Sequence, residues 1–255
     1  MSDTPTYAVE ATGTSLAILE TLVDAEEPLG VTALSEHVDV AKSVVHNHLS
    51  TLRAHGYVVK RNGQYEPSLR MLALGRQTRD RIPVVVGARA KVDNLADATG
   101  ETTTLFVIEA DQAVPAYVVE PSKGWSPPFS EGERMPLHVN APGKAILASL
   151  PDERVDEIIS PEYLSPYPDG TTADADALRE EIVQIREDGV AFSRTEQYDG
   201  VVGVASPIPT TSGTRPAAIG VVGPEDRLQG RHLEEDVTGQ VLSTSKAIQN
   251  ELTSA

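Results

Sequence analysis

The chain has 255 residues, enough for one large domain or two modest ones, and 40% of them are hydrophobic. It contains no cysteine, which excludes disulfide bonds, thiolate metal sites and a cysteine nucleophile. No apolar run is long enough to cross a bilayer, and the first ten residues do not resemble a signal peptide. These observations predict a cytoplasmic protein that makes no contact with a membrane.

The formal net charge is −17, from 38 acidic and 21 basic residues, and most of the basic residues are Arg. An acidic, lysine-poor surface stays hydrated in concentrated salt, so the composition favours a halophilic source. The charge is also uneven, because residues 40–91 contain ten Lys or Arg and two acidic residues, a net charge of +8. A basic segment in an acidic chain indicates contact with a polyanion. A solvated basic helix is the alternative.

The first part of the chain predicts three helices. Residues 1–12 are small and polar and are expected to form a flexible tail. Leucines at helical spacing then predict a helix over residues 14–24. A second helix is expected over residues 31–38, with Thr32 as its N-cap. A third helix follows, and Gly56 is expected to end it as the C′ residue.

The third helix and the segment after it indicate a DNA-binding motif. Val45, Leu49 and Leu52 stand at i, i+4 and i+7 and form a stripe that faces the core. An Asn-Gly pair then lies between two short strand-like runs, which indicates a β-hairpin. Three helices followed by a hairpin predict a winged helix-turn-helix domain over residues 13–67. In that motif the third helix enters the major groove of DNA.

Polar side chains are expected on the side of the third helix opposite the stripe. Asn47 can form two hydrogen bonds with adenine, and His46 and Ser50 can each donate or accept one. Ser43, near the start of the helix, can contact phosphate as readily as a base. Basic residues nearby are placed to contact phosphates. The DNA-binding candidates are Lys42, Ser43, His46, Asn47, Ser50, Arg53, Lys60 and Arg61. An ordinary solvated face is the alternative.

The histidines of this segment do not predict a metal site or a catalytic site. His46 and His48 point away from each other on a helix, and no cysteine or acidic cluster accompanies them. No carboxylate is placed to orient a histidine base. His48 and His55 flank the apolar stripe and are expected to serve packing or to lie at its rim. We therefore expect no metal, no cofactor and no catalytic residue.

A linker and a second domain are expected after the hairpin. Residues 68–82 have the pattern of a basic amphipathic linker helix that Pro83 interrupts, and a further helix follows over residues 84–100. Strand-like runs stand at residues 102–110, 113–121, 190–194, 201–209 and 216–224. Helical patterns stand at residues 142–150, 151–159, 175–189 and 228–255. This order predicts an α+β domain over residues 83–255 with a mainly antiparallel sheet.

The residues that begin the 142–150 helix suggest a ligand site. Asn140 is a good N-cap, Pro142 fits the first turn, and Gly143 lets a ligand approach the backbone. Free N–H groups at the positive end of the helix dipole are suited to bind a carboxylate. Lys144 either attracts the charge of that ligand or is a surface lysine. A plain helix cap that binds nothing is the alternative.

The order of these motifs resembles the IclR family of bacterial and archaeal transcription regulators, and the likeness covers nearly the whole chain. The DNA-binding part of that family is matched by LAILETL, LSEHVDVAKSVVHNHLSTLRAHGYV and NGQYEPSLRMLALG. Its effector domain is matched by LHVNAPGKAILASL (137–150), GVAFSRTEQYDGVVGVASPI (189–208) and PAAIGVVGP. A lone helix-turn-helix is weak evidence, but these blocks in this order are specific.

The resemblance implies a winged helix-turn-helix joined by a linker helix to a GAF-like ligand domain, in a homodimer or homotetramer. It also implies binding to palindromic double-stranded operator DNA and a response to a small organic acid. The effector-binding residues that it implies are Leu105, Asn140, Ala141, Pro142, Gly143, Ser193, Gly203 and Gly220. Where some members have an acidic residue, a cysteine and serines, this chain has Ser193, Gly203, Gly220 and Val222. The less polar wall favours a sugar acid or an aromatic acid over a very small acid.

Two other functions remain open. One is a small-molecule enzyme in the C-terminal domain, although the chain has no GxSxG, HExxH, P-loop or GxGxxG motif. His138 and His232 stand in none of these motifs. The other is a DNA-binding protein that acts constitutively and binds no ligand. Turnover of an organic acid by the purified protein supports the first, and a ligand screen without any stabilising compound supports the second.

Overall fold

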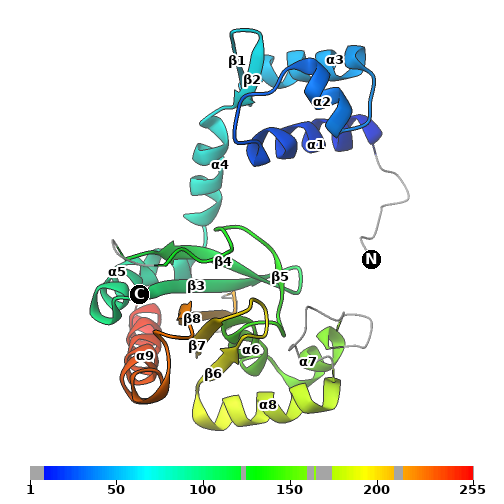
Figure 1. Cartoon of the computed structure of the whole chain (residues 1–255). Coiled ribbons are helices and arrows are strands. Elements are labelled where there is room, and N and C mark those ends of the chain that lie inside the picture. The colour runs from blue at the N-terminus through cyan, green and yellow to red at the C-terminus, as the bar shows by residue number, and fades with distance from the viewer. Residues whose placement is uncertain (1–8, 122–124, 160–163, 165–173, 210–214, 255) are drawn as a thin grey trace. The chain divides into compact units, whose positions relative to one another are not determined.

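A computed structural model describes residues 9–121, 125–159, 164, 174–209 and 215–254. The chain divides into two compact units, Met1–Thr78 and Arg79–Ala255 (Figure 1). The division falls within the helix α4 (Arg70–Arg79). Within the described residues, no helix is both long enough and apolar enough to span a membrane.

The first unit is a winged helix-turn-helix, which confirms the predicted fold. Its elements are α1 (Glu10–Asp24), α2 (Val31–His37), α3 (Lys42–Ala54), β1 (Val58–Arg61) and β2 (Gln64–Pro67). The predicted stripe of α3 is buried, with Val45 and Leu49 0% exposed and Leu52 8% exposed. The same core contains Ile18, Leu22, Leu34, Val58 and Tyr65. Packing of this stripe against α1 and α2 leaves the opposite side of α3 facing solvent.

Two turns of the first unit form as the local sequence predicts. Gly56 follows α3 with a φ of +77°, and the N–H of Tyr57 donates to the carbonyl of Leu52 over 2.8 Å. Asn62 and Gly63 have φ values of +52° and +87°, as a two-residue type I′ hairpin turn requires. Gly and Asn adopt this left-handed conformation more readily than other residues. The helix end and the wing are therefore set by local sequence.

Two details of the first unit differ from the prediction. Gly30, rather than Thr32, occupies the N-cap position of α2, so Thr32 lies in the first turn of the helix. α1 begins at Glu10, inside the segment predicted to be a flexible tail. A helix that is already nucleated gains one hydrogen bond for each residue added, so it extends without a strong cap. Residues 1–8 of that tail lie outside the described residues.

α4 occupies the middle of the segment predicted as a linker helix. The hydroxyl of Ser68 accepts a hydrogen bond from the N–H of Arg70 over 3.2 Å, which caps the helix start. No residue of α4, all of which is described, is buried. Leu72 is 53% exposed, and Leu69 just before the helix is 83% exposed. Pro83 is the first residue of the next helix, α5 (Pro83–Thr99), a position that suits proline.

The second unit is built on a sheet of six strands within the described residues, in the order β5-β4-β3-β8-β7-β6 (Figure 1). The strands are β3 (Thr102–Glu109), β4 (Gln112–Val119), β5 (Met135–Pro136), β6 (Ala191–Arg194), β7 (Val201–Ile208) and β8 (Ala217–Pro224). Every pair of neighbouring strands is antiparallel. This confirms the α+β class. β5 was not predicted, since two residues are too few to show a pattern.

The two faces of the sheet pack against different helices. The helices, besides α5, are α6 (Ala141–Ala148), α7 (Asp152–Ile158), α8 (Ala175–Asp188) and α9 (Thr238–Ser254). Leu105 and Val107 of β3 lie in a core with α5 and α9, whereas Phe106 lies in a core with α6, α7 and α8. Ile219 and Ala218 of β8 divide in the same way. Successive residues of a strand point to opposite faces, so each face has its own set.

The last two long helices follow the prediction to different degrees. α8 ends before Gly189, as predicted. Its predicted apolar side is buried, through Leu178, Ile182 and Ile185. The final helix is not α-helical throughout, because the π-helical segment η1 (His232–Val237) precedes α9. The hydroxyl of Thr238 donates to the carbonyl of Leu233 over 2.6 Å, five residues earlier, which suits the wider turn.

Candidate functional site

The outer side of α3 carries the polar residues predicted to bind DNA. All four of them are exposed: Ser43, His46, Asn47 and Ser50. His48 is half-buried instead, and its Nδ1 lies 2.8 Å from the hydroxyl of Ser15 in α1. His48 therefore belongs to the contact between α3 and α1, and His46 belongs to the outer face.

Two hydroxyl groups on this face form hydrogen bonds within α3. Ser50 donates to the carbonyl of His46 over 2.8 Å, and Thr51 donates to the carbonyl of Asn47 over 3.1 Å. A hydroxyl that donates to its own helix keeps its lone pairs, so Ser50 offers an acceptor to a base. The carboxamide of Asn47 offers both a donor and an acceptor, which matches the major-groove edge of adenine.

The basic candidates are also on the surface of the first unit. Lys42, Arg53, Lys60 and Arg61 are all exposed. In the wing, Nζ of Lys60 lies 5.0 Å from the centroid of the Tyr65 ring. Nε of Arg61 lies 2.9 Å from a carboxylate oxygen of Glu66, and the Arg61 side chain is 77% exposed. That pair is weak in water, but it offsets part of the charge of Arg61. Lys60 is therefore the better placed of the two for a phosphate.

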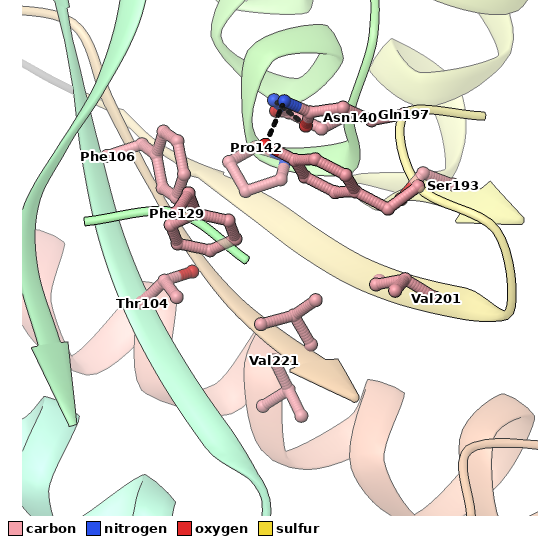
Figure 2. Close-up of a pocket in the computed structure, with 12 residues that line it drawn as sticks. Thr104, Phe106, Phe129, Asn140, Pro142, Ser193, Gln197, Val201 and Val221 are labelled. Atoms are coloured by element: carbon pink, nitrogen blue, oxygen red, sulfur yellow. Dashed lines mark hydrogen bonds between the residues drawn. The ribbon is translucent and has the colours of Figure 1, made fainter. Parts of the chain in front are cut away.

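The second candidate site is a pocket in the second unit, where β3, β7 and β8 pass the start of α6 (Figure 2). Its lining residues are Thr104, Phe106, Phe129, Asn140, Pro142, Ser193, Gln197, Tyr198, Val201, Gly203, Val221 and Val222. None of these described residues carries a formal charge. The volume that the centre of a water molecule can occupy is about 30 Å³, which is small for a ligand site.

Two aromatic rings form part of the wall of this pocket (Figure 2). The ring centroids of Phe106 and Phe129 are 5.8 Å apart, and their planes meet at 70°. This edge-to-face arrangement is the favoured geometry of an aromatic pair. Phe106 comes from β3 and Phe129 from the segment before β5, so the pair joins that segment to the sheet.

The start of α6 is capped as predicted but offers few free donors. Oδ1 of Asn140 accepts a hydrogen bond from the N–H of Gly143 over 2.9 Å. Nδ2 of Asn140 donates to Oε1 of Gln197 over 3.0 Å (Figure 2). Pro142 has no N–H, and that of Gly143 is already bonded to Asn140. The prediction of several free N–H groups for a carboxylate is therefore wrong at these positions.

The glycines near the pocket serve close packing. A Cβ atom on Gly143 would lie 2.3 Å from the carbonyl oxygen of Leu137, so Gly143 admits the backbone of Leu137 rather than a ligand. A Cβ atom on Gly220 would lie 2.8 Å from the carbonyl oxygen of Val204 in the neighbouring strand. Gly203 is different, since it lines the pocket. The predicted role of Gly143 in admitting a ligand is thus corrected.

The structure brings together half of the residues implied for the effector. Asn140, Pro142, Ser193 and Gly203 line the pocket. Leu105 does not, because it is 0% exposed in the core on the opposite face of the sheet. Its neighbours Thr104 and Phe106 line the pocket in its place. Ala141 is completely buried in the core around α6, and Gly220 packs against β7. Neither Ala141 nor Gly220 is a lining residue.

Sequence reasoning missed several lining residues. Thr104 and Phe106 alternate with Leu105 along β3, so the period of two in a strand could have placed them on one face. Phe129, Gln197 and Tyr198 lie in connecting segments, where no periodic pattern indicates which side chains turn inward. Phe129, Gln197 and Tyr198 could therefore be found only from the tertiary structure.

Lys144 is neither a ligand contact nor a surface lysine, which corrects both predictions for it. Its side chain is 2% exposed. Nζ lies 2.6 Å from Oε1 of Glu181 in α8 and 2.8 Å from Oε2 of Glu196. A buried ammonium group requires such partners, because transfer of an unpaired charge out of water is very costly. Lys144 therefore joins α6 to α8 and to the segment between β6 and β7.

Glu196 is the less exposed of the two carboxylates, and its ionisation is shifted. Burial raises the pKa of Glu196 above its usual 4.5, and the adjacent Lys144 opposes that rise. Gln197, the next residue, accepts the hydrogen bond from Asn140. Two consecutive side chains thus attach the β6–β7 segment to the start of α6. This attachment places Gln197 and Tyr198 in the wall of the pocket.

Comparison with known proteins decides the family. Residues 15–62 match the model of the IclR helix-turn-helix domain, and residues 76–250 match the model of the bacterial transcriptional regulator IclR C-terminal domain. The chain belongs to the IclR family. It is therefore a DNA-binding transcription regulator, as the resemblance implied, and its family is one of regulators rather than enzymes.

Individual relatives agree with this family. The HTH-type transcriptional regulator Rv1719 of Mycobacterium tuberculosis is 31% identical over 94% of this chain and 92% of its own length. The crystal structure of the Thermotoga maritima IclR protein superposes with a TM-score of 0.83 at 22% identity, over 96% of this chain and 99% of that one. The structure of an IclR homologue from Microbacterium hydrocarbonoxydans, complexed with 4-hydroxybenzoate, superposes with a TM-score of 0.77 at 19% identity, over 96% of this chain and 100% of that one. At these identities the structures establish the shared fold.

Proposed function

We propose that this IclR-family regulator binds a palindromic operator as a homodimer or homotetramer, through α3 and the wing of each subunit. The exposed face of α3 supports this, since Asn47, His46 and Ser50 provide donors and acceptors for base edges. Lys42, Arg53 and Lys60 around that face provide phosphate contacts in a protein that is otherwise acidic. Palindromic operators follow from two-fold symmetric regulators, because each subunit contacts one half-site.

We infer that the regulator is controlled by a small organic acid that widens this pocket as it binds, and that the lining suits an aromatic acid best. The observation that carries this is the edge-to-face pair Phe106–Phe129 in an apolar wall. An aromatic ring can pack against such a wall, while the hydroxyl of Ser193 and the amide of Gln197 can donate to a carboxylate. The fold is shared with a homologue that binds 4-hydroxybenzoate.

A sugar acid is the second candidate for the effector. With Ser193, Gly203 and Val222, this part of the wall is less polar than in some family members, whereas a sugar acid carries many hydroxyl groups. Each buried hydroxyl without a hydrogen-bond partner weakens binding. The largely apolar lining therefore favours the aromatic acid.

A thermal-shift series tests the proposed effector. The full chain is heated with 4-hydroxybenzoate, with benzoate and with galacturonate, at equal ionic strength. A ligand present at 100 times its Kd stabilises a protein by about 2.7 kcal/mol, which is readily seen as a rise in Tm. We expect a rise with the aromatic acids and none with galacturonate. Stabilisation by galacturonate alone contradicts the aromatic assignment, and no shift with any acid favours a ligand-free regulator.

The proposed operator and assembly need separate measurements. Selection of bound duplexes from a random library is expected to enrich an inverted repeat. Size-exclusion chromatography with light scattering is expected to give the mass of two or four chains. Enrichment of a single, non-repeated site by a monomer contradicts the proposal.

A further inference from the structure

The segment that lines one side of the pocket also contacts the linker helix. Phe129 lines the pocket and meets Phe106 edge to face. Two residues later, Glu131 makes a pair of contacts through its carboxylate. Oε1 accepts a hydrogen bond from the N–H of Val118 in β4 over 3.0 Å, and Oε2 accepts one from Nη1 of Arg79 over 2.6 Å. Glu131 therefore connects the pocket segment to both the sheet and Arg79.

Arg79 is the last residue of α4, and its side chain is only 20% exposed. Its guanidinium lies 5.5 Å from the centroid of the Tyr117 ring. Arg89 lies over the same ring at 5.7 Å, and the Tyr117 hydroxyl donates to Oδ1 of Asp93 over 2.9 Å. Arg89 and Asp93 belong to α5, so Arg79 sits in a cluster that joins the end of α4 to α5 and β4. Stacking of a guanidinium on an aromatic ring is favourable even without its carboxylate partner.

Arg70, at the other end of α4, lies over the Tyr57 ring of the first unit at 5.3 Å, and the residues between Arg70 and Arg79 are not buried. None of the residues of α4, which are all described, is buried, so the course of α4 depends on how its two ends are held. Ile82, three residues beyond Arg79, packs partly against the core, and its N–H donates to the carbonyl of Arg79. A helix of ten residues is roughly 15 Å long. A small rotation at Arg79 therefore produces a larger displacement at the other end of the helix.

The ion pair is suited to change between two arrangements. Glu131 is 40% exposed, and partly exposed pairs contribute little to stability, so breaking this one has a low cost. Arg79 also has its separate contact with the Tyr117 ring, which does not depend on the ion pair. A coupling between two sites needs an element with two accessible arrangements that both sites bias.

We propose that the Glu131–Arg79 ion pair couples ligand binding in the pocket to the position of α4. A ligand that contacts Phe129 displaces the segment that carries Glu131, and Glu131 then moves or releases Arg79 at the base of the linker helix. This rests on the proposed control by a ligand in this pocket. It assigns to Glu131 and Arg79 a regulatory role, although neither residue lies in the DNA-binding unit.

Hydrogen exchange of the full chain tests the contact without any ligand or DNA. E131Q retains an oxygen for the N–H of Val118 but loses its charge toward Arg79. We expect E131Q to accelerate exchange over residues 76–82, and R79M to accelerate exchange over residues 126–134. The control is D156N, which breaks the pair of Asp156 with Arg179 between α7 and α8 and should leave both segments unchanged. Unchanged exchange in the reciprocal segments of E131Q and R79M overturns the proposal.

A linkage measurement tests the coupling itself. Operator affinity is measured with and without 4-hydroxybenzoate, on a fragment selected from a random duplex library. Typical effectors change affinity by about 5–150-fold. We expect E131Q to bind 4-hydroxybenzoate within about threefold of the unmodified protein but to reduce its effect on operator affinity below about twofold. D156N should keep the full effect.

The outcomes separate this proposal from the proposed function. An undiminished ligand effect on operator affinity in E131Q overturns the coupling while the ligand assignment stands. If the unmodified protein binds no 4-hydroxybenzoate, the proposed ligand class fails. The exchange measurement can still overturn the proposed role of the Glu131–Arg79 contact, since it needs neither ligand nor operator.

Discussion

The side chain of Asn140 donates a hydrogen bond to that of Gln197 over 3.0 Å, across 57 residues of sequence. The same side chain caps α6 by accepting the N–H of Gly143. One residue thus holds the start of a helix and the segment that closes the pocket wall. Its two roles can be separated by mutation, because the chain contains a second helix with a similar cap far from the pocket.

Asn140→Ala is expected to reduce both stability and ligand affinity. Loss of an N-cap typically costs about 1 kcal/mol, and loss of the bond to Gln197 loosens the β6–β7 segment. The matched control is Asp174→Ala, since Asp174 caps α8 by accepting the N–H groups of Asp176 and Ala177. Urea unfolding and titration with 4-hydroxybenzoate measure the two effects. Equal loss of ligand affinity in both variants contradicts a specific role of Asn140 in the pocket.

Lys144→Met is expected to destabilise the second unit strongly. The substitution leaves Glu181 and Glu196 without their cation, and breaking a buried pair by removing one partner costs about 3–5 kcal/mol. Lys246→Met is the control, because Lys246 contacts Gln249 on the exposed side of α9 and should change stability little. Chemical denaturation monitored through Trp125 reports the difference. Similar small losses in both variants would show that Lys144 is not a structural centre.

Two carboxylates predict opposite pH dependences of stability. Burial raises the pKa of Glu196, so the folded state binds more protons and the contribution of Glu196 to stability falls as pH rises above its usual 4.5. Arg215 and Arg134 lower the pKa of Glu109, so its contribution is present above 4.5 and is lost as pH falls through the lowered pKa. The free energy of unfolding of E196Q, E109Q and the unmodified chain is measured by urea denaturation from pH 3 to 7, at intervals of about half a pH unit. The slope of the difference between each variant and the unmodified chain, plotted against pH, gives the contribution of each carboxylate. Slopes of the same sign disprove this assignment.

The contributions of base contacts and of phosphate contacts to operator affinity should respond differently to salt. Asn47→Ala is expected to cost about 1–3 kcal/mol of operator binding and to relax sequence preference, because it removes the proposed two-bond contact with a base. Lys60→Ala is expected to weaken binding to all sequences alike and to reduce the salt slope by about 1. High salt weakens phosphate contacts and so increases the share of base contacts in the affinity. Competition binding in the working salt measures both, and equal, sequence-independent losses would falsify the division.

Gly143→Ala should disrupt the second unit although the added group is one methyl. The new Cβ would lie 2.3 Å from the carbonyl oxygen of Leu137, so backbone must move. Gly75→Ala is the control, since Gly75 lies in exposed α4 with open space around its Cβ position. There the substitution should be stabilising by up to about 1 kcal/mol, because alanine favours a helix more than glycine. The Tm of both variants measures the contrast.

Much of the fold could be predicted because it depends on short-range pattern. The stripe Val45, Leu49 and Leu52 is buried where a period of 3.6 places it, and the Asn62-Gly63 turn forms the predicted hairpin. Helix and turn preferences act within a few residues, so one segment of sequence is enough to state them. The same holds for the four exposed polar residues of α3, which lie opposite its stripe.

The pocket could be predicted only in part. The Asn140 cap was readable, since capping involves residues a few positions apart. The hydrogen bond from Nδ2 of Asn140 to Gln197 could not be predicted, because Gln197 approaches Asn140 only when the β6–β7 segment packs beside α6. The position of Leu105 in β3 likewise could not be predicted from the sequence. Periodicity divides β3 into two faces, but it does not say which face α6 will cover.

The amino-acid sequence was enough to predict the winged helix-turn-helix, the alternation of strands and helices, and the acidic character of the chain around a basic segment. These are properties of composition and of neighbours along the backbone. The tertiary structure was needed to show that Lys144 is buried between two glutamates and that Phe129 meets Phe106. It also decided that Glu131 reaches the end of α4. Such contacts join segments distant in sequence, and burial of a common core selects them.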